Sequence, residues 1–264
     1  MPAADLSLLI DAAHAAAQIA LGFTAAETRR WDKPDGAGPV TEADLAVNRM
    51  LEDTLRAARP DYGWLSEETE DDPARLDSEC VFIIDPIDGT RSFANGSDTW
   101  AHSLAIARQG TVVAGVVFLP ARNMLYTAAA GQGAFLNETG IRSSKRSRLS
   151  GAEILAARSN LDPSHWPQGV PEFKRAHRPS LAYRMALVAQ GQYDAMFTFR
   201  PSWEWDIAAG DLILREAGAI CTDKIGECLR FNNPHPTVNG VVAAGESLHA
   251  QVLDALIPDR RLDA

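Results

Sequence analysis

Apolar residues recur at helical spacing in several segments of the chain. Leu6, Leu9 and Ala13 lie on one face of a predicted helix that ends at Gly22. A second helix is predicted to begin after Thr41, which has the side chain of an N-cap residue. The remaining helical patterns cover residues 182–189, residues 207–217 and a segment after residue 244.

Short apolar runs separated by turn residues predict strands. Residues 62–66 and residues 81–84 have the length and composition of buried strands. The runs after residue 100 predict further strands, and the first three of them favour an antiparallel meander. These runs are residues 103–107, 111–119, 124–128, 154–157 and 193–199.

Two polar segments are predicted to lie outside these elements. Residues 29–39 hold two prolines and two glycines and predict a mobile loop, and residues 67–78 predict an acidic loop that does not pack. Helices and strands alternate without strict βαβ order, which predicts an α+β or mixed α/β fold in layers. A basic stretch at residues 142–148 is the candidate boundary between residues 1–145 and residues 146–264.

The charge balance narrows the classes of partner. The 264 residues include 35 acidic and 25 basic side chains, which give a net charge of −10 and argue against a nucleic acid polymer as partner. The sequence contains no run of 18 apolar residues, so an integral membrane segment is not expected. The first residues also lack the pattern of a signal peptide. Three cysteines cannot build a disulfide framework, so the protein is expected in the cytoplasm.

Two carboxylates follow directly on the apolar run at residues 81–84. Asp85 and Asp88 would repel each other at the end of a buried strand, and loss of water adds to that cost. A Mg²⁺ ion would hold both ionised, and the carbonyl of Ile87 can converge on the same point. An ordinary β-turn is the alternative. Gly89 favours the metal and phosphate interpretation, because glycine allows close backbone approach.

Other carboxylates stand where a strand or a helix is predicted to end. Glu67 and Glu68 follow the run that ends at Ser66, and Asp206 immediately precedes the helix at residue 207. Asp206 as a simple N-cap, and Asp44 as part of a capping box, are the alternative explanations. Because each of these termini can direct its carboxylate to one shared point, their joint occurrence favours a single site.

Taken together, these motifs resemble the inositol monophosphatase superfamily of Mg²⁺-dependent, lithium-sensitive phosphatases. The resemblance covers nearly the whole chain and implies the layered αβαβα sandwich of that family as one compact catalytic unit. The N-terminal half would carry most metal ligands, and the C-terminal half the last one. The resemblance rests on Thr41-Glu42-Ala43-Asp44, Glu67-Glu68, Asp85-Pro86-Ile87-Asp88-Gly89-Thr90 and Trp205-Asp206-Ile207-Ala208-Ala209-Gly210.

The resemblance also implies a role for each matching residue. It implies a site for two to three Mg²⁺ ions, in which Asp85 is shared between two of them. Thr90 and Asp44 would orient and deprotonate the attacking water, with Glu67 as a third catalytic residue. Lys33 would help to close the site, and a solvated loop lysine is the alternative. The implied metal ligands are Glu67, Asp85, the Ile87 carbonyl, Asp88 and Asp206.

The sequence motifs favour two different substrates. Inositol monophosphatases carry a glutamate seven residues before the last metal Asp, and this chain has Phe199 there. The sequence around Phe199, together with Ser159 and Arg184, is similar to bacterial 3′(2′),5′-bisphosphate nucleotidases. Arg184 would then meet a second phosphate, and Phe199 or Trp203 would stack on a base. Core packing of the two aromatic side chains is the alternative.

Residues 133–137 look more like the inositol branch of the superfamily. The residues around Phe199, together with Ser159 and Arg184, nevertheless make the hydrolysis of adenosine 3′,5′-bisphosphate to AMP and phosphate the preferred reaction, with inositol 1-phosphate as a close alternative. Further alternatives are hydrolysis of histidinol phosphate and anion binding without catalysis. The only partner expected is a small phosphate ester, apart from a second copy of the chain, because family members are often dimers. The predicted substrate-binding residues are Asp88, Gly89, Thr90, Arg184 and Asp206; Lys33, Glu68, Ser159, Phe199 and Trp203 have less defined roles.

Overall fold

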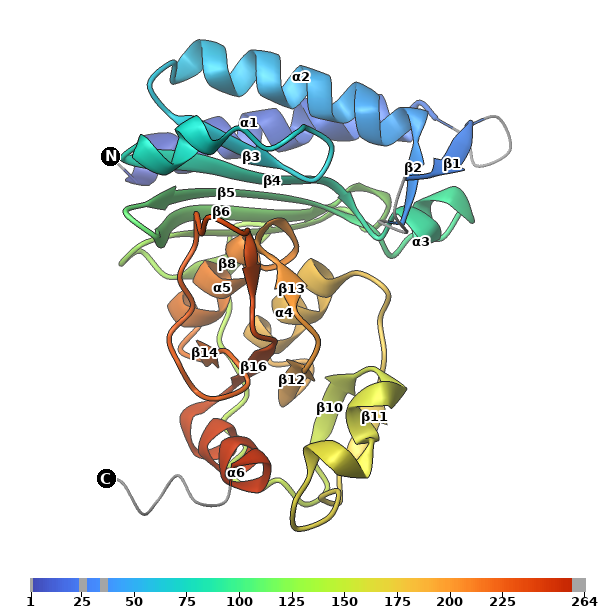
Figure 1. The fold of residues 1–264 in the computed structure, drawn as a ribbon, viewed down its shortest axis with the longest axis vertical. Helices are drawn as coiled ribbons and strands as arrows, with labels where there is room; N and C mark the ends of the chain where they lie inside the picture. Colours follow the sequence, from blue (N-terminus) through green and yellow to red (C-terminus); the bar gives the residue numbers. More distant parts are fainter. Residues whose placement is uncertain (1, 24–27, 34–37, 258–264) are drawn as a thin grey trace.

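A computed structural model describes residues 2–23, 28–33 and 38–257. Layers of helix and sheet alternate along its long axis (Figure 1). The layers are, in order, the helices α1 (Pro2–Leu21) and α2 (Glu42–Ala58), a seven-stranded sheet, the helices α4 (Leu181–Ala189) and α5 (Glu204–Glu216), a five-stranded sheet, and the helix α6 (Glu246–Leu256). This order is the αβαβα sandwich that the family resemblance implied.

The seven-stranded sheet has the strand order β3-β4-β5-β6-β7-β8-β9. Strands β3 and β4 are parallel, and every later neighbour is antiparallel, which confirms the predicted meander. The bounds are β3 Gly63–Ser66, β4 Cys80–Asp88, β5 Ala101–Arg108, β6 Thr111–Leu119, β7 Met124–Ala129, β8 Ala134–Leu136 and β9 Thr139–Gly140. A short helix, α3 (Thr90–Ala94), follows β4.

The five-stranded sheet has the order β11-β10-β12-β16-β14. Strand β10 is parallel to both of its neighbours, and β16 is antiparallel to both of its own. The bounds are β10 Glu153–Ala156, β11 Lys174–Ala176, β12 Ala195–Thr198, β14 Ile220–Thr222 and β16 Val241–Ala244; the two-stranded pairs are β1 Arg30–Asp32 with β2 Pro39–Thr41, and β13 Ser202–Trp203 with β15 Thr237–Val238. We retain a division near residue 145 as a proposal, since the first sheet ends before it and the second begins after it.

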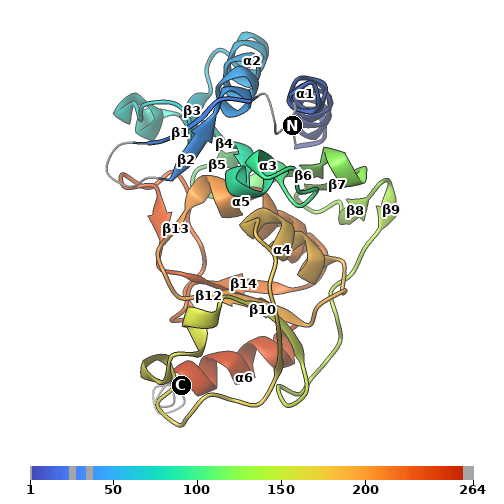
Figure 2. The same ribbon diagram turned by 90° about the vertical axis from the view of Figure 1, so that its right-hand side faces the viewer.

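Apolar side chains fill the spaces between the layers. Helices α1 and α2 cover one face of the seven-stranded sheet, and α4 and α5 cover the other (Figure 2). Helix α5 approaches β6 so closely that a Cβ on Gly115 would lie 3.1 Å from the Cα of Ala209. Gly210 on α5 leaves the same kind of room for Met185 of α4. These contacts fix α5, and with it Asp206, against the sheet that carries Asp85.

Helix α1 is the one described helix that is long and apolar enough to cross a membrane by length and composition alone. The stretch Ala3–Leu21 has a mean hydropathy of 1.2. Leu9, Ala13 and Ala16 are nevertheless fully buried in the cluster that α1 shares with α2 and the sheet. Helix α1 therefore packs as a core helix of the fold.

Two polar segments are more ordered than the sequence predicted. Part of residues 29–39 forms β1, which pairs with β2, while residues 34–37 lie outside the described part. The acidic segment 67–78 was predicted not to pack, and this is wrong. It contains a 3₁₀ helix (Pro73–Asp77) in which Arg75 is only 2% exposed, because that guanidinium is paired with Asp71 and with the C-terminal half.

Candidate metal and phosphate site

Strand β4 carries two of the predicted metal ligands past the point where the sequence predicted it to end. Asp85 pairs with Ser103 and Asp88 with Ala101, so three steps on β4 face two on β5. This is a β-bulge, and Pro86 within it has no N–H to donate to the neighbouring strand. The extra residue turns the side chains of Asp85 and Asp88 to the same side, where an uninterrupted strand would leave them on opposite faces. The β-turn alternative is therefore wrong.

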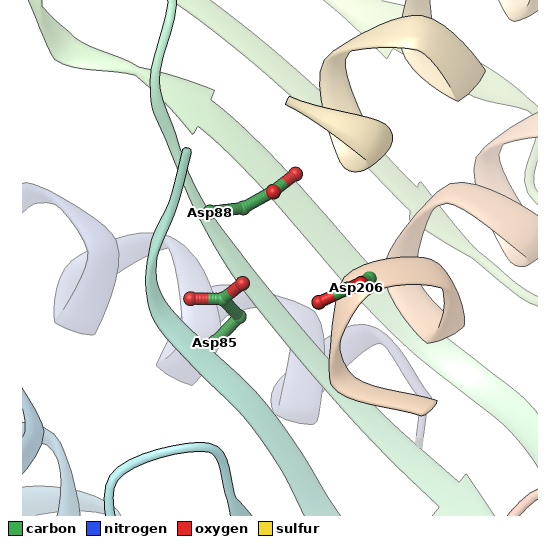
Figure 3. Close-up of side chains that lie close together, drawn as sticks. All are labelled: Asp85, Asp88 and Asp206. Carbon is green, nitrogen blue, oxygen red and sulfur yellow. The ribbon is translucent and has the colours of Figure 1, made fainter. Parts of the chain in front are cut away.

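Asp206 supplies the third carboxylate from a different element. Helix α5 is capped by Trp203, so Asp206 lies within its first turn, and the N-cap alternative is wrong. Oxygen atoms of Asp85, Asp88 and Asp206 all lie within 4.8 Å of one another (Figure 3). Among the residues that the structure describes, this is the one group of three or more acidic, His or Cys side chains close enough to hold a metal ion.

The electrostatics of the three carboxylates call for a cation. Burial, and then the charges of neighbouring carboxylates, raise the pKa values of Asp85 and Asp206 well above the usual range. Burial also raises the pKa of Asp88, although hydrogen bonds from α4 counteract it. A divalent ion relieves this repulsion, and an all-oxygen ligand set suits Mg²⁺. The residues present therefore fit the implied metal.

Helix α4 holds Asp88 by a contact that the sequence did not reveal. The Ser180 hydroxyl (2.6 Å) and the Ala182 amide (2.7 Å) both donate to Asp88 Oδ2. Ser180 is also the N-cap of α4, since it accepts from the Tyr183 amide. A serine before a helical pattern was the available signal, but it indicated only the cap.

The predicted catalytic pair is brought together beside the bulge. The Thr90 hydroxyl lies 3.2 Å from Asp44 Oδ1 and 3.2 Å from the Ile87 carbonyl oxygen. The other oxygen of Asp44 accepts from the amide and hydroxyl of Thr41, which completes the capping box of α2. Burial raises the pKa of Asp44 to about 6. Asp44 therefore serves as a cap and faces Thr90 at the same time.

Glu67 and Glu68 form the other side of the site with Lys33. The ammonium of Lys33 lies 2.9 Å from Glu67 Oε1 and 2.7 Å from Glu68 Oε1. Burial raises the pKa of Glu68 to about 7. Glu67 in turn contributes to the raised pKa values of Asp85, Asp206 and Asp44, so its charge is within reach of all three. The side chain of Lys33 is paired within the acidic site rather than solvated.

The candidate substrate residues differ in their surroundings. Phe199 is 4% exposed and stacks on Phe197 in the core, which is the core-packing alternative. Trp203 is 41% exposed and stacks on Trp205 at 4.7 Å, so core packing is wrong for it. Arg184 is buried and donates to the carbonyls of Arg178 and Pro179, so its guanidinium also anchors the segment before α4. Ser159 is exposed on a 3₁₀ segment.

His102 is a buried residue near the site that the sequence analysis missed. It pairs through Nδ1 with the carbonyl of Pro86 in the bulge, which means that Nδ1 donates the proton. Burial lowers the pKa of this imidazole from 6.5 to about 4. His102 is therefore neutral around pH 7 and holds the bulge that carries Asp85 and Asp88.

This burial predicts an acid-sensitive term in the stability. Between pH 6.5 and pH 4, His102 is protonated in the unfolded chain but stays neutral in the folded protein. Proton uptake therefore favours the unfolded chain, and the free energy of unfolding falls as the pH falls. From about pH 7 to about pH 4.5, wild type should lose about 2–3 kcal/mol more unfolding free energy than His102→Leu. Urea denaturation without metal at both pH values measures this, and parallel losses in the two proteins would contradict it.

Comparisons with known proteins agree with this geometry. The model of the inositol monophosphatase family matches residues 4–260. An inositol-1-monophosphatase of Rhizobium meliloti is 38% identical over 71% of this chain and 73% of its own length. A histidinol-phosphatase of Mycobacterium tuberculosis is 34% identical over 96% of this chain and 97% of its own.

Solved structures give the same result. The crystal structure of the extragenic suppressor protein suhB from Bartonella henselae is 30% identical, with a TM-score of 0.80. The match covers 96% of this chain and 98% of that one. Sequence, fold and the clustered carboxylates thus lead to one conclusion: this chain belongs to the inositol monophosphatase family.

Proposed function

We propose that this protein hydrolyses a small phosphate monoester with Mg²⁺ held by Asp85, Asp88, Asp206, Glu67 and the Ile87 carbonyl. The observation that carries the proposal is the convergence of three carboxylates within 4.8 Å, next to a Thr90 hydroxyl that lies 3.2 Å from both the Ile87 carbonyl oxygen and Asp44 Oδ1. When bound there, the ions would supply positive charge for the phosphoryl oxygens and lower the pKa of the attacking water.

The protein's own groups orient that water and remove its proton. Thr90 lies between the Ile87 carbonyl and Asp44, so its hydroxyl can accept from water while it donates to the Asp44 carboxylate. Asp44 is fixed by the capping box, which leaves its second oxygen directed at Thr90. This geometry needs no covalent nucleophile, in keeping with phosphoryl transfer by positioning and charge. We also propose that Lys33, which pairs with Glu67 and Glu68, helps to close the site.

For the substrate we propose adenosine 3′,5′-bisphosphate. The position of the polyol-binding glutamate is held by Phe199, whose buried ring offers no acceptor for a sugar or inositol hydroxyl. Trp203, two residues before Trp205 and close in sequence to Asp206, presents an exposed indole to a base. Arg184 and Arg200 both lower the pKa of Asp206 by their charge, so both lie near the site, and we propose that they also attract the second phosphate. Inositol 1-phosphate is the second candidate, favoured by the name of the 38% identical relative.

A substrate panel tests this choice. We expect the highest kcat/KM for adenosine 3′,5′-bisphosphate among that compound, inositol 1-phosphate, histidinol phosphate and fructose 1,6-bisphosphate. Trp203→Ala should lower kcat/KM for the nucleotide about tenfold, because a base stacked on an indole contributes about 1–3 kcal/mol. The same variant should leave β-glycerophosphate hydrolysis unchanged, since that ester has no base. A preference for inositol 1-phosphate would refute the nucleotide assignment.

Three further expectations accompany the proposed reaction. Millimolar lithium should inhibit the protein, and insensitivity would count against the family mechanism. We also propose that it acts in the cytoplasm on small esters rather than nucleic acid polymers, in keeping with its net charge of −10. A homodimer is proposed on the family resemblance alone and can be measured by sedimentation.

A further inference from the structure

Glu204 is a fully buried carboxylate that the proposed reaction does not use. It is the first residue of α5 and lies two positions before Asp206. Side chains two positions apart on a helix differ by about 200° in direction, so Glu204 points away from the metal ligands. Its oxygens accept from the amides of Asn232 (2.6 Å) and Asn233 (2.9 Å) and from the Asn233 side chain (2.7 Å).

Arg75 holds the same loop from the opposite side. Its guanidinium donates to Asn232 Oδ1 (2.6 Å) and to the Asn233 carbonyl (3.0 Å), while its own carbonyl accepts from Asn232 Nδ2 (3.1 Å). The remaining donors of Arg75 form a two-point contact with Asp71 at 2.5 and 2.9 Å. Arg75 is almost completely buried, so its bonds to Asn232 and Asn233 are largely shielded from water, whereas Asp71 is exposed.

The loop between them is held in a conformation that other residues rarely adopt. Asn232 has a φ of +62°, which asparagine tolerates better than most residues. Both polar atoms of its side chain are used by Arg75, and its amide is used by Glu204. We call Arg75, Glu204, Asn232 and Asn233 the latch, because together they join two distant segments of the chain.

The latch connects the two segments that bring Glu67 and Asp206 to the site. On one side, Arg75 and Asp71 lie in the segment that leaves β3 directly after Glu67. On the other side, Glu204 begins the helix that carries Asp206. We infer that the latch is a positioning device that fixes Glu67 relative to Asp206 and so sets the affinity of the site for divalent metal. This inference rests on the proposed metal-dependent function.

Metal binding measured without turnover tests the inference. Mn²⁺ titrations followed by electron paramagnetic resonance give the affinity directly, and Mn²⁺ suits the same oxygen ligands. Glu204→Gln keeps the shape but loses the charge that faces the loop amides, and Arg75→Met removes every guanidinium bond. Each should weaken Mn²⁺ binding about tenfold, the lower end of the range for groups bonded directly to metal ligands, because the latch acts on Glu67 and Asp206 only through the backbone. The double variant should also bind Mn²⁺ about tenfold more weakly than wild type, and no worse, if Glu204 and Arg75 both act through one loop.

Activity then separates positioning from catalysis. At saturating Mg²⁺ the variants should regain kcat close to that of wild type, with KM for substrate unchanged, because neither residue touches substrate. A milder variant, Asn232→Gly, keeps the positive φ and loses only the contacts with Arg75, so it should fold and weaken Mn²⁺ binding to a smaller extent.

Arg59→Met is a control for the loss of an arginine ion pair elsewhere in the fold, although the Arg59 side chain is 31% exposed. Arg59 pairs with Asp5 at 2.9 Å between α1 and the end of α2, away from the acidic site. The Arg59→Met substitution should lower thermal stability and leave Mn²⁺ affinity unchanged. If the latch variants, Asn232→Gly included, also bind Mn²⁺ as wild type does, the latch is structural only and the inference is overturned. A wild-type chain that binds no Mn²⁺ would instead refute the proposed function itself.

Discussion

Asp88→Asn should reduce Mg²⁺-dependent phosphatase activity by about a thousandfold or more, because it removes charge worth several kcal/mol to the transition state. The fold should survive. One oxygen of Asp88 only accepts hydrogen bonds from Ser180 and Ala182, and the amide oxygen of asparagine can do the same. The new NH₂ group then faces Asp85 and Asp206, where a metal ligand is needed. Steady-state kinetics with a Mg²⁺ titration measure the loss.

The same substitution should stabilise the metal-free protein. Two carboxylates at most 4.8 Å apart repel by about 3 kcal/mol at an effective dielectric of about 20, so removing one charge should raise the free energy of unfolding by about 1–3 kcal/mol. Denaturation in EDTA tests this sign. Asp211→Asn is the matched control: Asp211 is buried on the same helix as Asp206 but pairs with Arg215, so its replacement should leave turnover intact. Wild-type turnover in Asp88→Asn would refute the metal site.

The sequence revealed the acidic site because its residues are unusual where they stand. Carboxylates directly after apolar runs, as at Asp85 and Glu67, have no reason to be there unless something positive joins them. The geometry between them was not readable, since it depends on the bulge at Pro86 and on α5 packing against Gly115. The order of the layers came from the family resemblance rather than from periodicity.

The residues that support the site escaped prediction for one physical reason. Ser180 lies 92 positions from Asp88, and Arg75 lies 157 positions from Asn232, so no local pattern links the partners. The segment 67–78 was predicted not to pack because it is an acidic loop, but Arg75 within it is buried. The burial of Arg75 depends on acceptors in the other half of the chain, such as the carbonyl of Asn233.

The aromatic residues near Asp206 show a similar limit. Phe199 and Trp203 lie four positions apart around a strand end, yet one is in the core and the other is exposed. The direction in which a side chain leaves a strand end depends on the turn that follows, which the residue types do not specify. For Phe199 this removes base stacking from the proposal and leaves Trp203 as the candidate platform.

Thr90→Val should lower kcat by about 10²–10⁴-fold, the range expected when a group that moves a proton is lost. Valine has nearly the shape of threonine but cannot donate to Asp44 or orient a water beside the Ile87 carbonyl. Because the Thr90 side chain is not a predicted metal ligand, Mn²⁺ affinity should stay as in wild type. That separates this variant from Asp88→Asn, in which activity and metal binding are lost together.

Thr90→Ser is the matched control, since it restores the hydroxyl at the same place on α3. It should recover most of the wild-type kcat, whereas a merely structural role for Thr90 would leave serine and valine similarly impaired. If Thr90→Val kept wild-type kcat at saturating Mg²⁺, the water would not be oriented by the Thr90–Asp44 pair. The proton acceptor would then have to be another carboxylate of the site, and Glu67, whose charge acts on Asp44, is the candidate.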